Sequence, residues 1–206
     1  MNKKFLHIGC GRLTKEHSTN FFNSPQWDEV RVDIDESVKP DIVSSMTDMS
    51  VINSNQFDAI YSSHNIEHLF SHEVILALNE FRRVLNDDGF LIITCPDIQS
   101  VCKEVAEGNL TNALYQSGLG PISAIDILYG LRSHIAKGNH YMAHKVGFTG
   151  SVLNSTLLGC GFKSSVTVSK SSEYALWAIA YKTHDVSPDD CISELRKHVN
   201  LSDNFV

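Results

Sequence analysis

The stretch KFLHIGCGRLTKEH, residues 4–17, places an apolar run directly before two glycines that are one residue apart. Residues 4–8 are predicted to form a short buried strand that ends at Gly9 and Gly11. Glycine has no Cβ, so it adopts positive φ easily and lets a bound molecule approach the backbone closely. Ligands of open α/β sheets bind at the carboxyl ends of strands, where this loop would lie. Taken alone, the two glycines also fit a tight turn.

Asp33 supplies a second feature that points to a nucleoside. It ends a predicted strand over 29–34, about 20 residues beyond the glycines, a spacing at which a carboxylate reaches a ribose diol. Thr14 replaces the third glycine of a dinucleotide-binding loop, which disfavours a pyrophosphate at a helix N-terminus. We therefore expect a nucleoside cofactor without a pyrophosphate, and an NAD(P)-dependent oxidoreductase is the weaker alternative.

Strand and helix signals alternate along the next part of the chain. Further strands are predicted at 40–46, 57–62 and 89–97. Helical spacing of apolar residues predicts a helix over 71–86, with Ser71 as its cap and Asp88-Gly89 closing it. The segment after the glycine loop has no clean period, so the first crossover is predicted to be short or irregular. The alternation predicts an α/β fold with a Rossmann-like doubly wound sheet.

The C-terminal third completes this sheet. A helix is predicted that begins at 151 and ends at Gly161, followed by strands over 163–170 and 174–182 that form a hairpin around Ser171-Ser172. The sheet is therefore predicted to be mostly parallel, with an antiparallel C-terminal hairpin strand.

Residues 1–182 are predicted to form a single domain with one insertion. Residues 98–150 break the alternation and are rich in Gly, Ser, His and Tyr, with helical pieces near 99–107 and 122–137. A long irregular segment inside a domain is typically a lid or substrate-binding element. The tail over 183–206 is polar and is expected to pack weakly.

Composition excludes several classes of partner. The chain has 206 residues and a net charge of −7, with no run of Lys and Arg, which disfavours a nucleic-acid substrate. Its five cysteines form no CxxC pair, which is typical of reduced thiols in a cytoplasmic protein. We expect no membrane span, because no stretch approaches about 20 apolar residues. The oligomeric state is not predicted.

Several motifs together resemble one known family. They are LHIGCG (6–11), RVDIDE (31–36), Asp48-Met49, FDAIYSSHNIEHL (57–69) and FRRVLNDDGFLIITCPD (81–97). This combination resembles the class I S-adenosylmethionine-dependent methyltransferases, and the last two motifs are similar to the small bacterial type 11 group. The resemblance covers about residues 4–97, and it implies S-adenosylmethionine as the cofactor.

The resemblance also implies which residues contact the cofactor. The glycines would line its methionine and ribose part, Asp33 would hold the ribose hydroxyls with Asp35 as a second candidate, and Asp48 with Met49 would flank the adenine. Asp48 could instead serve as a helix cap or in a solvated turn. The implied cofactor-binding residues are Gly9, Gly11, Asp33, Asp35, Asp48, Met49 and Ser63.

Methyl transfer is an in-line displacement, so the protein mainly aligns the nucleophile and excludes water. A base of near-neutral pKa helps when the acceptor is a hydroxyl or an amine. His64 follows the fourth predicted strand and would face the methyl group, whereas His68 would brace the loop. The predicted catalytic residues are His64, Asp97 and His140.

A second polar cluster lies in the insertion, in a stretch that the resemblance places over the site. Its predicted substrate-binding residues are Tyr129, Arg132, His144 and Lys145, suited to an anionic or sugar-like acceptor unless they are surface charges on a mobile loop. His140 and His144 have helical spacing, but nearby glycines argue against a long helix, and we expect no metal site. The predicted function is methyl transfer to a small-molecule or saccharide-type acceptor. The alternative is a non-catalytic S-adenosylmethionine-binding or partner-binding protein of the same fold.

Overall fold

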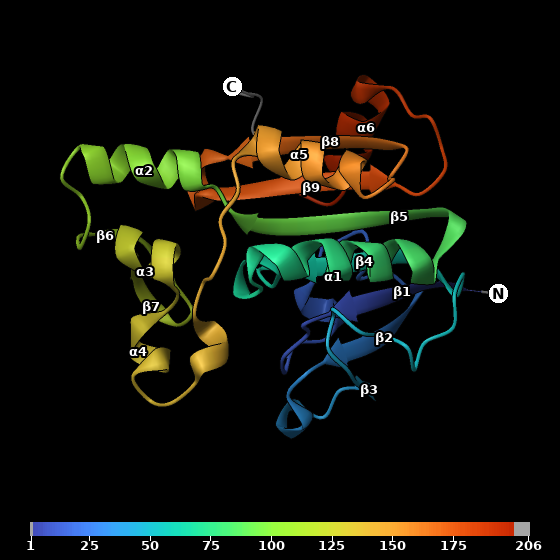
Figure 1. Cartoon of the computed structure of the whole chain (residues 1–206), viewed down its shortest axis with the longest axis horizontal. Coiled ribbons are helices and arrows are strands. Elements are labelled where there is room, and N and C mark those ends of the chain that lie inside the picture. Colours follow the sequence, from blue (N-terminus) through green and yellow to red (C-terminus); the bar gives the residue numbers. More distant parts are fainter. Residues whose placement is uncertain (1, 200–206) are drawn as a thin grey trace.

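The computed structural model describes residues 2–199, which form a seven-stranded sheet of order β3-β2-β1-β4-β5-β9-β8 (Figure 1). Strands β1 to β5 run parallel, and β9 is antiparallel to both β5 and β8. The predicted doubly wound α/β fold with an antiparallel C-terminal hairpin is thus confirmed. The strands are β1 (Lys3–Ile8), β2 (Trp27–Asp33), β3 (Ile42–Val43), β4 (Phe57–Ser63), β5 (Leu85–Pro96), β8 (Ser164–Lys170) and β9 (Ala175–Tyr181).

Helices cover both faces of this sheet. On one face, α1 (Ser71–Val84) and α5 (Gly150–Gly159) pack over a core that contains Leu6 and Ile8 (Figure 1). Phe5 points to the opposite face, as the two-residue repeat of a strand requires. The crossover from β1 to β2 contains only the short 3-10 turn η1 (Lys15–His17), as its lack of periodicity predicted.

The expectation of a weakly packed tail is wrong for its described part, 183–199. Helix α6 (Pro188–Leu195) covers the second face of the sheet and buries Cys191 and Leu195 completely. His198 is also buried, and its Nδ1 lies 3.2 Å from Thr19 Oγ1. A few apolar positions within a polar sequence were enough to dock this helix. Residues 200–206 lie outside the described part of the chain.

The ends of α1 differ from their prediction. Phe70 is the N-cap, and its N–H donates to Glu73 Oε2 at 2.8 Å, so Ser71 is the first helical residue rather than the cap. The helix ends at Val84, and β5 begins at the next residue because Leu85 already has extended backbone angles. The Asp88-Gly89 pair therefore lies inside β5 and does not close the helix.

Residues 98–149 form a separate small layer at one end of the sheet, on the left in Figure 1. The predicted helix over 122–137 is broken into shorter pieces, and a hairpin precedes it that the sequence did not indicate. Val101, Ile122 and Ile127 belong to a small core of this segment, distinct from the two cores of the sheet. The elements are α2 (Ile98–Ala106), β6 (Ala113–Ser117), β7 (Gly120–Ser123), α3 (Ala124–Tyr129), α4 (Arg132–Ile135) and η4 (His140–Met142).

Candidate active site

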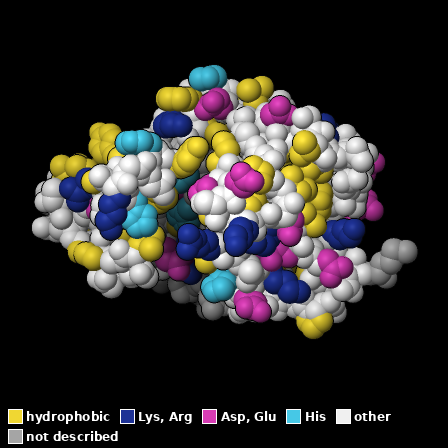
Figure 2. Space-filling view, turned by 90° about the horizontal axis from the view of Figure 1, so that it is seen from below, with side chains coloured by type: hydrophobic (Ala, Val, Ile, Leu, Met, Phe, Trp, Pro, Cys, Tyr) yellow, Lys and Arg dark blue, Asp and Glu magenta, His cyan; other side chains and the backbone are white. Residues whose placement is uncertain are grey.

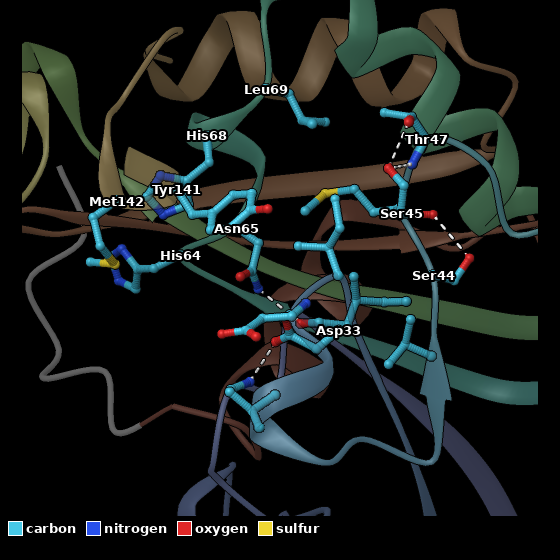
Figure 3. Close-up of a pocket in the computed structure, with 18 of the residues that line it drawn as sticks. Asp33, Ser44, Ser45, Thr47, His64, Asn65, His68, Leu69, Tyr141 and Met142 are labelled. Carbon is cyan, nitrogen blue, oxygen red and sulfur yellow. Dashed lines mark hydrogen bonds between the residues drawn. The ribbon is translucent and has the colours of Figure 1, made fainter. Parts of the chain in front are cut away.

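A cavity of about 450 Å³ opens at the carboxyl ends of β1, β2 and β4. These strands flank the point where the strand order reverses, which is where open α/β sheets bind their ligands. The volume lies within the ~300–1,000 Å³ typical of small-molecule sites. Ser44 and Thr47 lie at one end, His64 and Met142 at the other, and Asp33 lies between them (Figure 3).

The glycine loop, Gly9 to Gly11, lines the cavity and also packs against the side chain of Asn65. Gly9 and Gly11 have φ values of +61° and +52°, a region that side chains rarely adopt. A Cβ on Gly9 would collide with the side-chain amide of Asn65, whose Nδ2 donates to Ile8 O at 2.8 Å and to Ser63 O at 3.0 Å. Asn65 thereby joins the ends of β1 and β4, a role that the sequence did not reveal.

Asp33 is held in place by main-chain donors. Its Oδ2 accepts the Gly11 N–H at 2.7 Å, and its Oδ1 accepts the Asp35 N–H at 2.9 Å. The Arg31 guanidinium donates to Gly11 O at 2.8 Å and fixes the other side of the loop. Each oxygen of Asp33 retains a lone pair that can accept a ligand hydroxyl. The structure brings Gly9, Gly11, Asp33, Asp35 and Ser63 together on the cavity wall.

Asp48 and Met49 do not line the cavity, contrary to prediction. The Met49 side chain is fully buried and its N–H donates to Glu80 Oε2 at 2.7 Å. Asp48 accepts the Ser50 N–H at 3.1 Å in an exposed turn, which is the alternative left open for it. Because β3 is only two residues long, the chain turns away from the cavity before it reaches Asp48. The wall is formed by Ser44, Ser45, Met46 and Thr47 instead.

His64 stands where the cavity meets a second one. Its φ is +54°, a strained conformation for histidine, and such strain concentrates at functional sites. Its side chain is 50% exposed, and its Nδ1 lies 3.3 Å from Oε1 of the buried Glu67. Burial acts to lower the pKa of His64, but the adjacent carboxylate of Glu67 outweighs it, so the pKa is raised.

The second cavity has a volume of about 230 Å³ and lies between the sheet and residues 98–149. His64, His68 and Met142 line both cavities, so the two adjoin. The space-filling view shows this face of the molecule hollowed between its two lobes (Figure 2). The remaining lining residues are Glu67, Pro96, Tyr115, Ser117, Leu119, Ile122, Asp126, Ile127, Leu131, His144, Glu173 and Tyr174.

Two predicted catalytic residues line neither cavity. Asp97 is buried, caps α2, and accepts hydrogen bonds from Ser100 Oγ and Ser169 Oγ, both at 2.6 Å. Its carboxylate is therefore occupied by structural partners and is unsuited to the predicted role of base. His140 is exposed at the start of η4, and its neighbours Tyr141 and Met142 line the larger cavity.

The four predicted substrate-binding residues separate into two groups. Tyr129 is 64% exposed, and Arg132 donates to Asp126 at 2.8 Å, so neither lines a cavity. His144 lines the second cavity, whereas Lys145 lines the larger one with its ammonium 4.6 Å from the Phe70 ring centroid. An anionic acceptor held by Arg132 and Lys145 together is thus not supported.

Close polar partners account for the positions of two further histidines, His68 and His7. His68 donates from Nδ1 to Ala143 O at 3.2 Å, which braces the loop as the sequence suggested. His7 is buried in β1, and its Nδ1 lies 2.7 Å from Glu29 Oε1. Burial lowers the pKa of His144, which favours its neutral ring.

Comparison with known families agrees with this geometry. Residues 6–93 match the type 11 family model, described as a methyltransferase domain. Over these residues, which are a little less than half of the chain, the sequence is similar to a type 11 methyltransferase domain. The match agrees with S-adenosylmethionine as the expected cofactor. No curated protein matches it significantly.

Three solved structures share the fold of the methyltransferase. The citrinin polyketide synthase CMeT domain is 12% identical with a TM-score of 0.57, and the alignment covers 89% of this chain but only 47% of that one. Burkholderia thailandensis 1,6-didemethyltoxoflavin-N1-methyltransferase, bound to S-adenosylhomocysteine, is 16% identical with a TM-score of 0.55, covering 89% and 72%. A methyltransferase from Archaeoglobus fulgidus is 15% identical with a TM-score of 0.54, covering 87% and 86%. At these identities the likeness is one of fold.

The residues of the larger cavity fit this cofactor. A Cβ on Gly11 would meet no atom within 4 Å, so the backbone is open to a ligand there. The two oxygens of Asp33 suit a ribose diol, and Ile34, Val38 and Met46 offer an apolar surface for a flat base. No helix among residues 2–199 is long and apolar enough to cross a membrane.

Proposed function

We propose that this methyltransferase transfers a methyl group to a small-molecule acceptor that binds in the second cavity. The observation that carries the proposal is the junction of the two cavities at His64, His68 and Met142. A ligand spanning the larger cavity from the Ser44–Thr47 end would present its far end to this junction (Figure 3). An acceptor in the second cavity would meet it there.

The lining of the second cavity favours a neutral or cationic acceptor with a flat apolar face. Tyr115 and Tyr174 stack with ring centroids 6.3 Å apart and belong to this lining. Its charged groups are the carboxylates of Glu67, Asp126 and Glu173, and no Lys or Arg is among its lining residues. An aromatic ring or the apolar face of a saccharide would both suit such a surface.

Bound S-adenosylmethionine supplies an electrophilic methyl group, and the residues of this chain position the acceptor. His64 lies between the cavities and would contact the acceptor's hydroxyl or amine. Because its Nδ1 faces Glu67, Nε2 is the nitrogen left to take the acceptor proton. His64 would therefore both align the acceptor and take its proton.

Residues 98–150 would act as the lid over the second cavity within a single domain formed by 1–182. Both ends of this segment are tied together, because the Ile98 N–H donates to Phe148 O at 3.0 Å. The Lys145 N–H donates to Glu67 O at 2.8 Å and docks the segment onto the junction. Such a lid would keep water away from the reacting groups. The five free cysteines favour a cytoplasmic location.

Calorimetry with S-adenosylhomocysteine tests the cofactor part of this proposal. The parent is expected to bind, and Asp33→Ala to bind roughly 10–100-fold more weakly, since hydrogen bonds to a charged group contribute about 1.5–3 kcal/mol. Asp48→Ala is the matched control and should bind like the parent. Absence of heat, or an Asp33→Ala variant equal to the parent, would contradict the proposal.

Methyl transfer itself is tested with labelled S-adenosylmethionine and a panel of aromatic and saccharide acceptors. Transfer of label to at least one neutral or cationic member is expected. Cofactor binding without transfer to any member would instead favour a non-catalytic binding protein of this fold.

A further inference from the structure

Glu67 is a buried carboxylate whose hydrogen bonding is incomplete. Glu67 is 1% exposed, and within residues 2–199 neither its Oε1 nor its Oε2 has a hydrogen-bond partner. The nearest charged group is His64, whose Nδ1 lies 3.3 Å from Oε1. A carboxylate in such a setting needs a compensating positive group, because an unpaired buried charge is strongly unfavourable.

Two histidines beside Glu67 are held in the form that binds a cation. His144 Nδ1 lies 2.7 Å from Ile127 O, and His68 Nδ1 lies 3.2 Å from Ala143 O. A carbonyl oxygen can only accept, so Nδ1 of each ring carries the proton. In the neutral ring Nε2 then carries a free lone pair. This arrangement, with a main-chain carbonyl orienting the ring, is typical of histidines that ligate metals.

The three side chains converge on one point. One ligand atom from each of Glu67, His68 and His144 lies within 4.8 Å of the other two. The ring centroids of His68 and His144 are 5.0 Å apart with an angle of 64° between the ring planes, and no direct hydrogen bond joins either ring to Glu67 among the described residues. One possible ligand atom from each side chain therefore borders a gap that an ion could bridge.

We propose that Glu67, His68 and His144 bind a divalent transition-metal ion. Two imidazoles and one carboxylate form a ligand set of catalytic zinc sites and of non-haem iron sites, which keep further positions open. Imidazole ligands disfavour Mg²⁺ and Ca²⁺, which prefer oxygen. Ligand atoms would have to move slightly closer, and the residues come from a short turn, η3 (Ile66–His68), and a loop, which permit such movement.

The position of this site would allow the ion to act on the acceptor as well as to stabilise the fold. All three ligands line the second cavity, and His68 lines both. An open coordination position there would contact the hydroxyl or amine of an acceptor and lower its pKa. This role rests on the proposed function, whereas metal binding itself does not.

Metal titration of the full chain tests the proposal after chelator treatment and removal of the chelator. We expect one Zn²⁺ or Co²⁺ per chain and no comparable binding of Mg²⁺. Bound Co²⁺ should show the visible bands of a low-coordinate nitrogen and oxygen site, without a sulfur charge-transfer band. Zn²⁺ should also raise the Tm of the parent.

Three variants make the test specific. His144→Ala and Glu67→Gln should weaken Zn²⁺ binding at least about 100-fold, the upper end of losses seen for residues that only orient ligands. His184→Ala removes an exposed histidine at the far end of β9 and should bind like the parent. Glu67→Gln keeps the shape of the side chain. It is therefore the variant to measure if His144→Ala fails to fold.

Three outcomes would overturn the metal site. They are a parent that binds no Zn²⁺ or Co²⁺, a Glu67→Gln variant that binds as tightly as the parent, and a sulfur charge-transfer band. Calorimetry with S-adenosylhomocysteine on the same samples separates the two proposals. Retained cofactor binding with absent metal binding would reject the metal site alone.

Discussion

The two cavities meet at His64 but are built in different ways. The larger one is lined by strand ends and by turns that follow them, with main-chain groups such as the Gly11 N–H holding Asp33 in place. The second is lined mainly by side chains from residues 115–144, which have a small core of their own. The larger cavity, which we call the cofactor side, thus depends on the sheet. The second cavity, the proposed acceptor side, depends on how a separate layer docks against the sheet. A substitution in one cavity should therefore leave the other cavity unchanged, except at the junction, where His64, His68 and Met142 line both.

The junction should show the largest effect. His64→Asn removes the proposed proton acceptor while Asn tolerates positive φ better than most residues. We expect kcat for an identified acceptor to fall by about 10²–10⁴-fold, the usual contribution of a general base. Affinity for S-adenosylhomocysteine should change little. Steady-state kinetics and calorimetry check this together, and an unchanged kcat would remove His64 from the mechanism.

Gly9→Ala should damage the cofactor side. The new Cβ would collide with Asn65 in a conformation already unfavourable for alanine, so we expect a loss of about 3 kcal/mol in the free energy of unfolding. Denaturant unfolding measures the loss. Gly159→Ala is the matched control, because Gly159 ends α5 and a Cβ there meets nothing within 4 Å. Equal stability of the two variants would contradict the steric argument.

Lowering the pH should also reduce the free energy of unfolding, because His198 is buried against the sheet. Burial lowers the pKa of His198 from 6.5 to about 3, so between these values the unfolded chain binds the proton and the folded chain does not. This term is therefore fully favourable above pH 6.5 and is lost as pH falls, by roughly 2 kcal/mol at pH 5. Unfolding at pH 7 and pH 5 should reveal a steeper pH dependence in the parent than in His198→Gln.

Asp126→Asn should act on the acceptor side alone. Burial acts to raise the pKa of Asp126, but hydrogen bonds from Arg132 and Ser123 outweigh it and lower the pKa to about 2. Losing the charge should destabilise residues 120–135 locally by about 1–2 kcal/mol. Hydrogen exchange should speed up there, with cofactor affinity unchanged. Faster exchange across β1 and β4 as well would show that the two sides are not independent.

The sequence predicted which strand ends meet at the larger cavity, because the signals for them are local. Strand ends at Gly9, Asp33 and Ser63 meet at one edge of a parallel sheet, so spacing along the chain was enough to bring them together. Asp48 and Met49 were misplaced because β3 stops after two residues, and the turn that follows depends on Glu80 from a distant helix.

The acceptor side was predicted poorly because its residues gain their roles through packing. Asp97 follows β5 as expected, yet Ser100 and Ser169 occupy its carboxylate. Arg132 is an exposed donor in the sequence but pairs with Asp126 in the fold. Glu67 and His144 are 77 positions apart in the numbering, and the docking of Lys145 and Val146 onto the Glu67 carbonyl brings them together.

A crystal structure of the full chain with S-adenosylhomocysteine tests the central claim most directly. We expect the ribose hydroxyls on Asp33, the adenine beside Met46 and Thr47, and the sulfur facing His64 at the mouth of the second cavity. A sulfur atom directed away from His64, or a cofactor bound outside the larger cavity, would contradict it.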